Sequence, residues 1–213
     1  KRQSLTRAKN AIDAGALSAE IAPVTVKTRK GDTVVTDDEQ PHKAVVEKIP
    51  GLRPAFAKDG SITAANSSSI SDGASALVLM TEDDAKSRGL SPMARIVGHS
   101  RHSQEPSEFT IAPIGAVRKL LDQAGWEVAD VDLFEINEAF AMVTMLAIQE
   151  LGLDHDKVNV HGGACAQGHP IGSTGSRIIV TLMHALKKYG KKRGVAALCI
   201  GGGEATAVGI ELI

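Results

Sequence analysis

The sequence lacks the features that would assign it to several large classes of protein. It has no uninterrupted apolar run of about 18 residues or more, so it predicts no membrane-spanning helix. Its two cysteines, Cys165 and Cys199, cannot build a disulfide framework and favour a reducing compartment. Its formal net charge of −1 argues against bulk binding to nucleic acid. What is present is a chain of 213 residues whose hydrophobic fraction of 43% suits a globular core.

Sequence motifs for nucleotides and metals are missing as well. No Walker A pattern occurs, and Gly168, Gly172 and Gly175 do not have the spacing of a dinucleotide-binding loop. His99 and His102 lie three residues apart without cysteine or carboxylate partners at ligand spacing. We therefore expect no metal site and no bound cofactor.

The first ninety residues combine turns with short regular segments. The expected elements are, in order, a helix over residues 5–15 capped by Ser4, turns and extended segments over 22–60, a loop over 61–70 and a strand over 74–80. Thr81 and Asp84 have the spacing of a capping box. They predict a further helix that ends at Gly89.

From residue 91 onward, strands and helices alternate. The expected elements are strands over 94–98 and 131–136, a short extended piece over 158–160, helices over 113–124, 138–151 and 170–189, and a closing strand pair over 195–200 and 205–213. The helix over 138–151 has apolar residues on nearly every face, so we expect it to be buried between layers. Apolar strands that alternate with helices predict a layered α/β fold, with mixed sheets between helices.

Asn137 is the first candidate functional residue, because it lies where an expected strand gives way to an expected helix. Asparagine is a common helix N-cap, and that role alone would explain it. The alternative is that its amide holds a water molecule or a substrate oxygen. From this residue alone, both interpretations stay open.

His169 is the second candidate, in a stretch of small residues that ends at Pro170. Gly168 lets the backbone approach another group closely. We expect His169 at the positive end of the following helix, where an imidazole can polarise an oxyanion or pair with a thiolate. A capping or core histidine is the alternative, and the glycine before it and the Pro-Ile-Gly after it argue against that reading.

Cys199 is the third candidate, at the end of an apolar strand and just before three glycines that start at Gly201. A buried cysteine is usually just a small hydrophobic residue. Three glycines, however, offer backbone N–H groups of the kind that an oxyanion hole requires. A thiol with a pKa of about 8.5 can move a proton to and from carbon when its surroundings adjust that pKa.

Together these stretches resemble the thiolase family of acetyl-CoA acetyltransferases and 3-ketoacyl-CoA thiolases. The family motifs NEAF, GHPxG and CxGGG occur in that order at residues 137–140, 168–172 and 199–203. Residues 52–56 and 66–74 are similar to two further family motifs, so the resemblance extends over essentially the whole chain. It implies a fold of two similar α/β halves packed as five layers, with a loop domain inserted in the first half.

The resemblance also implies roles for individual residues. His169 would activate a nucleophilic cysteine and help to bind the thioester oxygen, and Asn137 would hold the water that completes this first oxyanion hole. Cys199 would be the acid and base at the α-carbon of the second acyl-CoA, with the Gly201 N–H in the second oxyanion hole. The residues implied to bind the coenzyme A thioester are Ser68, Ala64, Phe56, Ala139 and Phe140.

The resemblance divides the chain into three parts. Residues 1–70 would be part of the loop domain that binds coenzyme A, residues 71–90 the last strand and helix of the N-terminal half, and residues 91–213 the C-terminal domain. No residue matches the nucleophilic cysteine of the N-terminal half. Because the sequence opens on Lys1 without an initiator methionine or an apolar signal region, we expect an internal cut there.

The implied function is that of an acyl-CoA C-acyltransferase, which condenses or cleaves 3-ketoacyl-CoA reversibly through a ping-pong acyl-enzyme mechanism and is inactive as this chain alone. The expected partners are acetyl-CoA, 3-ketoacyl-CoA, coenzyme A, the missing N-terminal half, and further copies in a homodimer or homotetramer. We expect a cytoplasmic location, or a mitochondrial or peroxisomal one in a eukaryote. The alternatives are a non-catalytic module that binds coenzyme A or dimerises, and a ketoacyl synthase relative, against which Cys199 argues.

Overall fold

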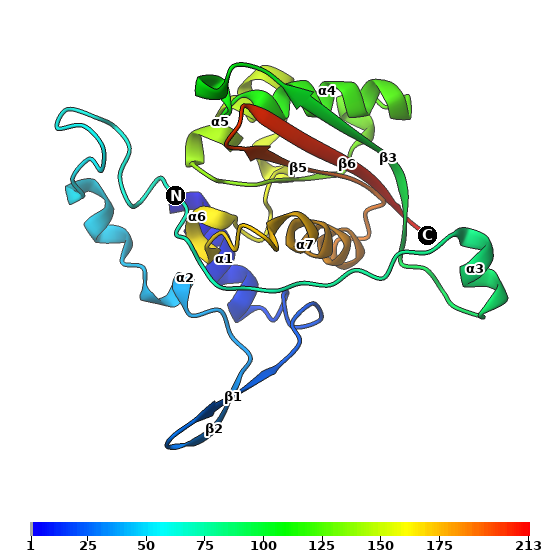
Figure 1. Cartoon of the computed structure of the whole chain (residues 1–213), viewed down its shortest axis with the longest axis horizontal. Coiled ribbons are helices and arrows are strands. Elements are labelled where there is room, and N and C mark those ends of the chain that lie inside the picture. Colours follow the sequence, from blue (N-terminus) through cyan, green and yellow to red (C-terminus); the bar gives the residue numbers. More distant parts are fainter. Residues whose placement is uncertain (1) are drawn as a thin grey trace.

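The computed structural model describes residues 2–213 and combines a four-stranded mixed sheet, helices on both of its faces and a separate hairpin (Figure 1). The helices are α1 (Arg2–Asp13), α2 (Gln40–Lys43), α3 (Glu82–Ser87), α4 (Ala112–Ala124), α5 (Ala141–Leu151), α6 (Ala164–Gln167) and α7 (Thr174–Lys188). The strands are β1 (Val24–Thr28), β2 (Gly31–Val35), β3 (Ala94–Ser103), β4 (Leu133–Ile136), β5 (Arg193–Ile200) and β6 (Glu204–Leu212).

The strands of the main sheet lie in the order β3-β6-β5-β4. Strand β6 pairs antiparallel with β3 and β5, while β4 pairs parallel with β5 and places Ile136 beside Ala197. Because parallel strands end at the same edge of a sheet, the residues that follow β4 and β5 are brought together. The mixed sheet between helices confirms the predicted fold class.

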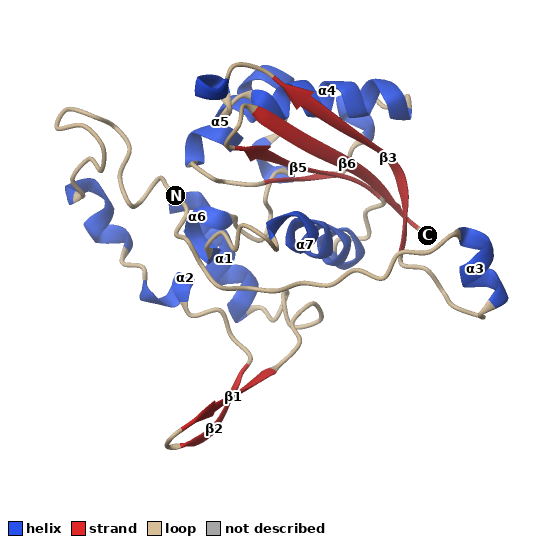
Figure 2. Ribbon diagram, in the orientation of Figure 1, coloured by secondary structure: helices blue, strands red, loops and turns tan. Residues whose placement is uncertain are grey.

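Helices cover both faces of this sheet, with α4 and α5 on one face and α7 on the other (Figure 2). Side chains alternate along β4: Phe134 and Ile136 join the core under α4 and α5, and Leu133 joins the core under α7. Both faces of the strand are therefore buried, which explains why its sequence is apolar almost throughout.

Two element ends follow the sequence signals that predict them. The Thr81 hydroxyl accepts a hydrogen bond from the Asp84 backbone N–H at 3.2 Å and donates one to the Asp84 carboxylate at 3.1 Å, which opens α3. Gly125 ends α4 with a φ of 64°, a left-handed conformation that glycine adopts at little cost. Both predictions are confirmed.

Two predicted helix starts are wrong. Ser4 is not an N-cap, because α1 already covers it and its side chain faces other parts of the molecule. Helix α7 begins at Thr174 rather than at Pro170, because residues 170–173 form a turn in which the Ser173 and Thr174 N–H groups both donate to the Pro170 carbonyl at 2.8 Å. His169 therefore precedes a turn and does not lie directly at a helix N-terminus.

Helix α5 also differs from the helix predicted over residues 138–151. It begins at Ala141, because Phe140 is extended and forms an isolated bridge with Ser67. Along α5, Val143 is fully buried, whereas Met145 is 66% exposed. One face of α5 covers the sheet, and the opposite face is open.

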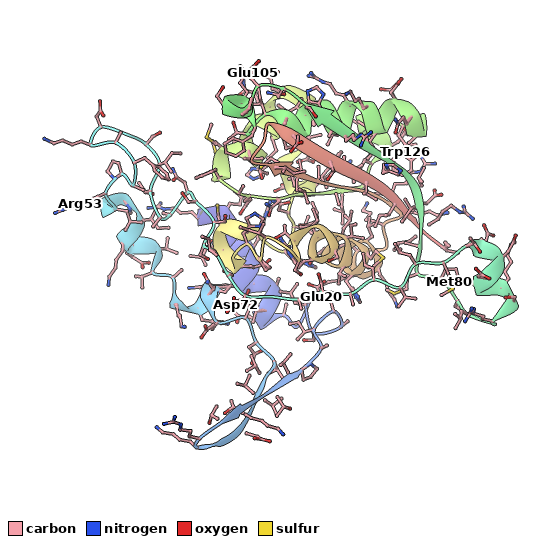
Figure 3. The ribbon with its side chains drawn as sticks, in the orientation of Figure 1. Glu20, Arg53, Asp72, Met80, Glu105 and Trp126 are labelled. Atoms are coloured by element: carbon pink, nitrogen blue, oxygen red, sulfur yellow. The ribbon has the colours of Figure 1, made fainter. Side chains whose placement is uncertain are left out.

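The segment over residues 74–80 is extended but is not a strand, contrary to prediction. It runs past α7 towards α3, and Asp72 and Met80 mark its two ends in Figure 3. No neighbour pairs with it within residues 2–213, and Val78 and Leu79 are 85% and 70% exposed. An apolar extended segment becomes a strand only where another strand completes its hydrogen bonds.

Within residues 2–213, no helix is both long enough and apolar enough to cross a membrane. The same part of the chain has no group of three or more histidine, cysteine or carboxylate side chains that could hold a metal ion.

Candidate active site

Asn137 lies directly after β4, where its backbone N–H donates to the Ala197 carbonyl of β5 at 2.9 Å. The N-cap interpretation is excluded, because α5 starts four residues later with Phe140 at its cap. The Asn137 side chain is 1% exposed, and neither its oxygen nor its nitrogen has a hydrogen-bond partner within residues 2–213. A buried amide without partners is costly, so this amide is suited to bind a water molecule or a substrate oxygen.

His169 is held by backbone and side-chain contacts on two sides. Its N–H donates to the Ser69 carbonyl at 2.9 Å, and its Nδ1 lies 2.7 Å from the Thr174 hydroxyl. Because the Thr174 hydroxyl donates its own hydrogen to the Pro170 carbonyl at 3.0 Å, Nδ1 is assigned as the donor to Thr174. This tautomer leaves Nε2 as the basic nitrogen.

The electrostatic surroundings of His169 keep it neutral. Burial, and then the positive charge of Arg177, lower the pKa of the imidazole below its usual value. A neutral imidazole with a free Nε2 can take a proton from a thiol or hydroxyl nucleophile.

Gly168 is required by the close approach of the loop over residues 66–71. Its φ is 94°, and a Cβ there would collide with the Ser71 side chain. The sequence interpretation of Gly168 as a place of close approach is therefore confirmed.

Cys199 lies near the end of β5 and is 8% exposed. Burial raises the pKa of its thiol to about 11, so it is protonated at neutral pH. Gly201 lies in the turn that joins β5 to β6, and within residues 2–213 no atom comes within 4 Å of a Cβ built on it.

The structure brings the three candidate stretches to the same end of the sheet. Asn137 and Cys199 follow or end the adjacent strands β4 and β5. In the first turn of α7, a Cβ on Gly175 would lie 3.6 Å from the Leu198 side chain, and the neighbouring Thr174 binds His169.

The five residues expected to bind the thioester divide into two groups. Ser68 donates to the Ala139 carbonyl from both its backbone N–H and its hydroxyl, at 3.1 and 2.9 Å, and the Phe140 ring packs edge-on to Phe109. These residues join the loop to the motif that contains Asn137. Phe56 is 79% exposed and Ala64 is also exposed, and their roles in binding the thioester stay predictions.

Sequence reasoning missed Glu135 and Glu138. Glu135 is 2% exposed, and burial raises the pKa of its carboxyl to about 8. Glu138 accepts hydrogen bonds from the Ser4 hydroxyl at 2.8 Å and the Cys165 N–H at 3.0 Å. A carboxylate inside an otherwise apolar strand was the available signal for Glu135; the partners of Glu138 lie far from it in the sequence and gave none.

Sequence comparisons agree with this geometry. A sequence model of the thiolase N-terminal domain matches residues 2–83, and one of the thiolase C-terminal domain matches residues 90–212. The cytosolic acetyl-CoA acetyltransferase of Mus musculus is 49% identical over 211 residues, with 98% of this chain and 53% of that protein covered. The acetyl-CoA acetyltransferase of Paracoccus denitrificans is 47% identical over 209 residues, covering 98% of this chain and 54% of that protein.

Solved structures give the same result. The Bacillus anthracis acetyl-CoA acetyltransferase has a TM-score of 0.96 and 47% identity, with 99% of this chain and 54% of that chain covered. Human mitochondrial 3-ketoacyl-CoA thiolase has a TM-score of 0.91 and 42% identity, with 99% and 54% covered. The chain thus spans about half the length of the relatives it matches. On both the sequence matches and the fold, this chain belongs to the thiolase family.

Proposed function

We propose that this chain is part of an acyl-CoA C-acyltransferase that condenses acyl-CoA to 3-ketoacyl-CoA and cleaves it in reverse, through a ping-pong acyl-enzyme mechanism. The observation that carries the proposal is the buried Asn137 amide, which has no partner within residues 2–213 and lies beside β5, the strand that contains Cys199 near its end. The names of the relatives, acetyl-CoA acetyltransferases, support acetyl-CoA as a substrate.

In the first half-reaction, His169 takes the proton of the nucleophilic cysteine through Nε2. The thiolate attacks the acyl-CoA carbonyl, and coenzyme A leaves as the acyl-enzyme forms. The Asn137 amide, directly or through a water molecule, stabilises the oxyanion on that carbonyl. Backbone hydrogen bonds hold Asn137 to β5 and His169 to Ser69, so little backbone reorganisation is needed.

In the second half-reaction, Cys199 exchanges a proton with the α-carbon of the second acyl-CoA. In condensation the resulting carbanion attacks the acyl-enzyme carbonyl, and the nucleophilic cysteine leaves as a thiolate. Because burial raises the pKa of the Cys199 thiol to about 11, it rests protonated, ready to return a proton to carbon in thiolysis. In condensation it must first release that proton to solvent, and the resulting thiolate then removes the α-proton. The Gly201 N–H is proposed to bind the enolate oxygen.

Substitution of Cys199 by serine in the complete enzyme tests this function. Cys199→Ser is expected to spare acylation but to lower condensation and thiolysis about 10²–10⁴-fold, because a hydroxyl is a far weaker acid than a thiol. Cys165→Ser is the matched control, since Cys165 is buried and its thiol donates to the Glu138 carbonyl at 3.6 Å. If Cys199→Ser slowed both half-reactions equally, the proposal that Cys199 acts only in the second half-reaction would be contradicted.

We further propose that the chain alone forms no acyl-enzyme. Both of its cysteines are buried, and we assign neither as the nucleophile, so the acylated cysteine has to come from the rest of the enzyme. Incubation of the chain with acetyl-CoA, followed by intact mass measurement, should show no acetyl adduct. A stable adduct on Cys165 or Cys199 would overturn this proposal.

The domain assignment and the cellular setting belong to the same proposal. Residues 1–70 are proposed as part of the loop domain that binds coenzyme A, 71–90 as the end of the N-terminal half, and 91–213 as the C-terminal domain. We propose a cytoplasmic homodimer or homotetramer; a cytosolic relative supports the location, although a similar structure is mitochondrial.

A further inference from the structure

Asn159 completes the end of β4 with its side chain, in the place that a neighbouring strand would occupy. Its Oδ1 accepts a hydrogen bond from the Ile136 N–H, and its Nδ2 donates one to the Ile136 carbonyl, both at 2.8 Å. Its backbone N–H donates to the Phe134 carbonyl at 2.9 Å. Because β4 is the last strand of the sheet order, these bonds satisfy backbone groups that β5 cannot reach.

The backbone of Asn159 is as unusual as its side chain. Its φ is 49°, and it is the only residue other than glycine with a positive φ within residues 2–213. Asparagine tolerates this left-handed conformation better than most residues. Glycine would adopt the positive φ easily but has no side chain to bond Ile136. An ionised aspartate has a side chain of similar shape but no hydrogen to donate to the Ile136 carbonyl. Among the common residues, asparagine alone offers this backbone together with both hydrogen bonds to Ile136.

Asn159 also starts the loop that carries His169. Its carbonyl accepts a hydrogen bond from the Gly162 N–H at 2.9 Å. A Cβ on Gly163 would lie 3.0 Å from the Asn159 Nδ2 and 2.6 Å from the Glu138 carboxyl carbon. The loop is therefore packed against the Asn159 side chain and against Glu138, the residue that follows Asn137.

We propose that Asn159 is a positioning residue for the Asn137 carboxamide. It fixes the peptide group that precedes Asn137, and thereby the direction of an amide that has no partner of its own within residues 2–213. The inference rests on the proposed function, in which this amide stabilises an oxyanion. A group that acts in the transition state loses effect when its support is loosened, so turnover should fall more than substrate affinity.

The test uses Asn159→Asp in the complete enzyme. A carboxylate cannot donate to the Ile136 carbonyl, so the acylation rate constant at pH 8 should fall about 10–100-fold, as for other supporting residues, with KM changed by less than about twofold. A protonated carboxyl can both donate and accept. The rate relative to wild type should therefore recover as the pH is lowered, and this recovery should appear at a temperature where circular dichroism shows the variant and the wild type fully folded at every pH, which separates it from general loosening of the fold.

Two further variants separate positioning from stability. Thr144→Val removes a different hydrogen bond to the same carbonyl, from the Thr144 hydroxyl at 3.2 Å, without releasing the Ile136 N–H. The turnover of Thr144→Val should differ from that of the wild type by less than about threefold, measured at a temperature where circular dichroism shows the variant and the wild type folded. Asn159→Gly permits the positive φ but lacks both bonds, so it should lose turnover without any recovery at low pH.

The outcomes distinguish this inference from the proposed function. Equal losses in Thr144→Val and Asn159→Asp, or no recovery of Asn159→Asp at low pH, would overturn the positioning role. A wild-type complete enzyme that forms no acyl-enzyme would overturn the proposed function, and this inference with it. An active wild type with an equally active Asn159→Asp variant would overturn the positioning role alone.

Discussion

The sheet region (residues 94–212) and the open segment (residues 24–80) differ in how far their apolar side chains are buried. In the sheet region Phe134 is 2% exposed and Val195 is fully buried, whereas in the open segment Phe56 and Leu79 are 79% and 70% exposed. The sheet region thus contains its own core, and the open segment presents apolar surface that its own fold does not cover. The candidate site lies where the two meet, through the bond from the His169 N–H to Ser69.

The largest expected effect concerns chemistry in the sheet region. In the complete enzyme, His169→Ala should slow both half-reactions by at least about 10³-fold, because one residue supplies the general base and part of the oxyanion hole. Rapid mixing with acetyl-CoA measures the rate of acylation, and the steady-state rate of thiolysis reports on the other half-reaction. His155→Ala, at an exposed histidine, is the control. A loss confined to one half-reaction would contradict the dual role.

The next effect compares two phenylalanines, one from each region. Phe134→Ala should lower the free energy of unfolding by about 3–5 kcal/mol, because it opens a cavity in the core. Phe56→Ala should change it by less than about 0.5 kcal/mol, because its ring is already in solvent. Urea unfolding measures both. Similar losses of unfolding free energy in the two variants would show that the Phe56 ring is buried in solution and that the two regions do not differ in burial as described.

Glu135 gives the stability of the sheet region a pH dependence. Burial raises the pKa of its carboxyl from 4.5 to about 8, so the folded state holds the proton more tightly than the unfolded chain does. This contribution to stability is fully present below about pH 4.5 and is lost as the pH rises through 8. Glu135→Gln should remove a slope of up to about 1.4 kcal/mol per pH unit. Urea unfolding measured from about pH 4.5 to pH 8 gives the slope of the unfolding free energy with pH. Identical slopes in the wild type and in Glu135→Gln would refute the prediction.

The smallest expected effect concerns the open segment. The isolated chain should self-associate through the uncovered segment over residues 74–80. The double variant Val78→Lys/Leu79→Lys should weaken association about tenfold, or about 1.4 kcal/mol, by light scattering. The control double variant Ser107→Lys/Gln123→Lys adds the same charge at exposed polar sites and should weaken self-association less. A wild-type chain that is monomeric and binds no hydrophobic dye would contradict the expectation that another part of the enzyme covers this surface.

Local signals in the sequence were sufficient to predict several elements and element ends. The Thr81–Asp84 cap and the end of α4 at Gly125 each depend on residues only a few positions apart, so they could be predicted. The closing β5–β6 hairpin, with glycines in its turn, was predicted for the same reason. The candidate residues Asn137, His169 and Cys199 each lie at or near the end of an element, where such local patterns place them.

Contacts between distant residues account for what the sequence did not reveal. The late start of α5 follows from the Ser67–Phe140 bridge, and the unpaired segment over 74–80 has no partner within residues 2–213. Asn159 looked like part of a short extended piece, because its bonds to Ile136 join residues 23 positions apart. A single sequence contains no direct signal for such a pair.

The contact between α1 and the loop at Gly162 has a consequence for the order of folding. A Cβ on Gly162 would lie 2.5 Å from the Ser4 carbonyl oxygen, and the Gly163 N–H donates to the Ser4 hydroxyl across 159 positions of sequence. During synthesis α1 leaves the ribosome well before this loop does, so these contacts cannot form until the loop has been made. Long-range contacts of this kind slow folding, so α1 should dock late and leave the site loop incomplete until then.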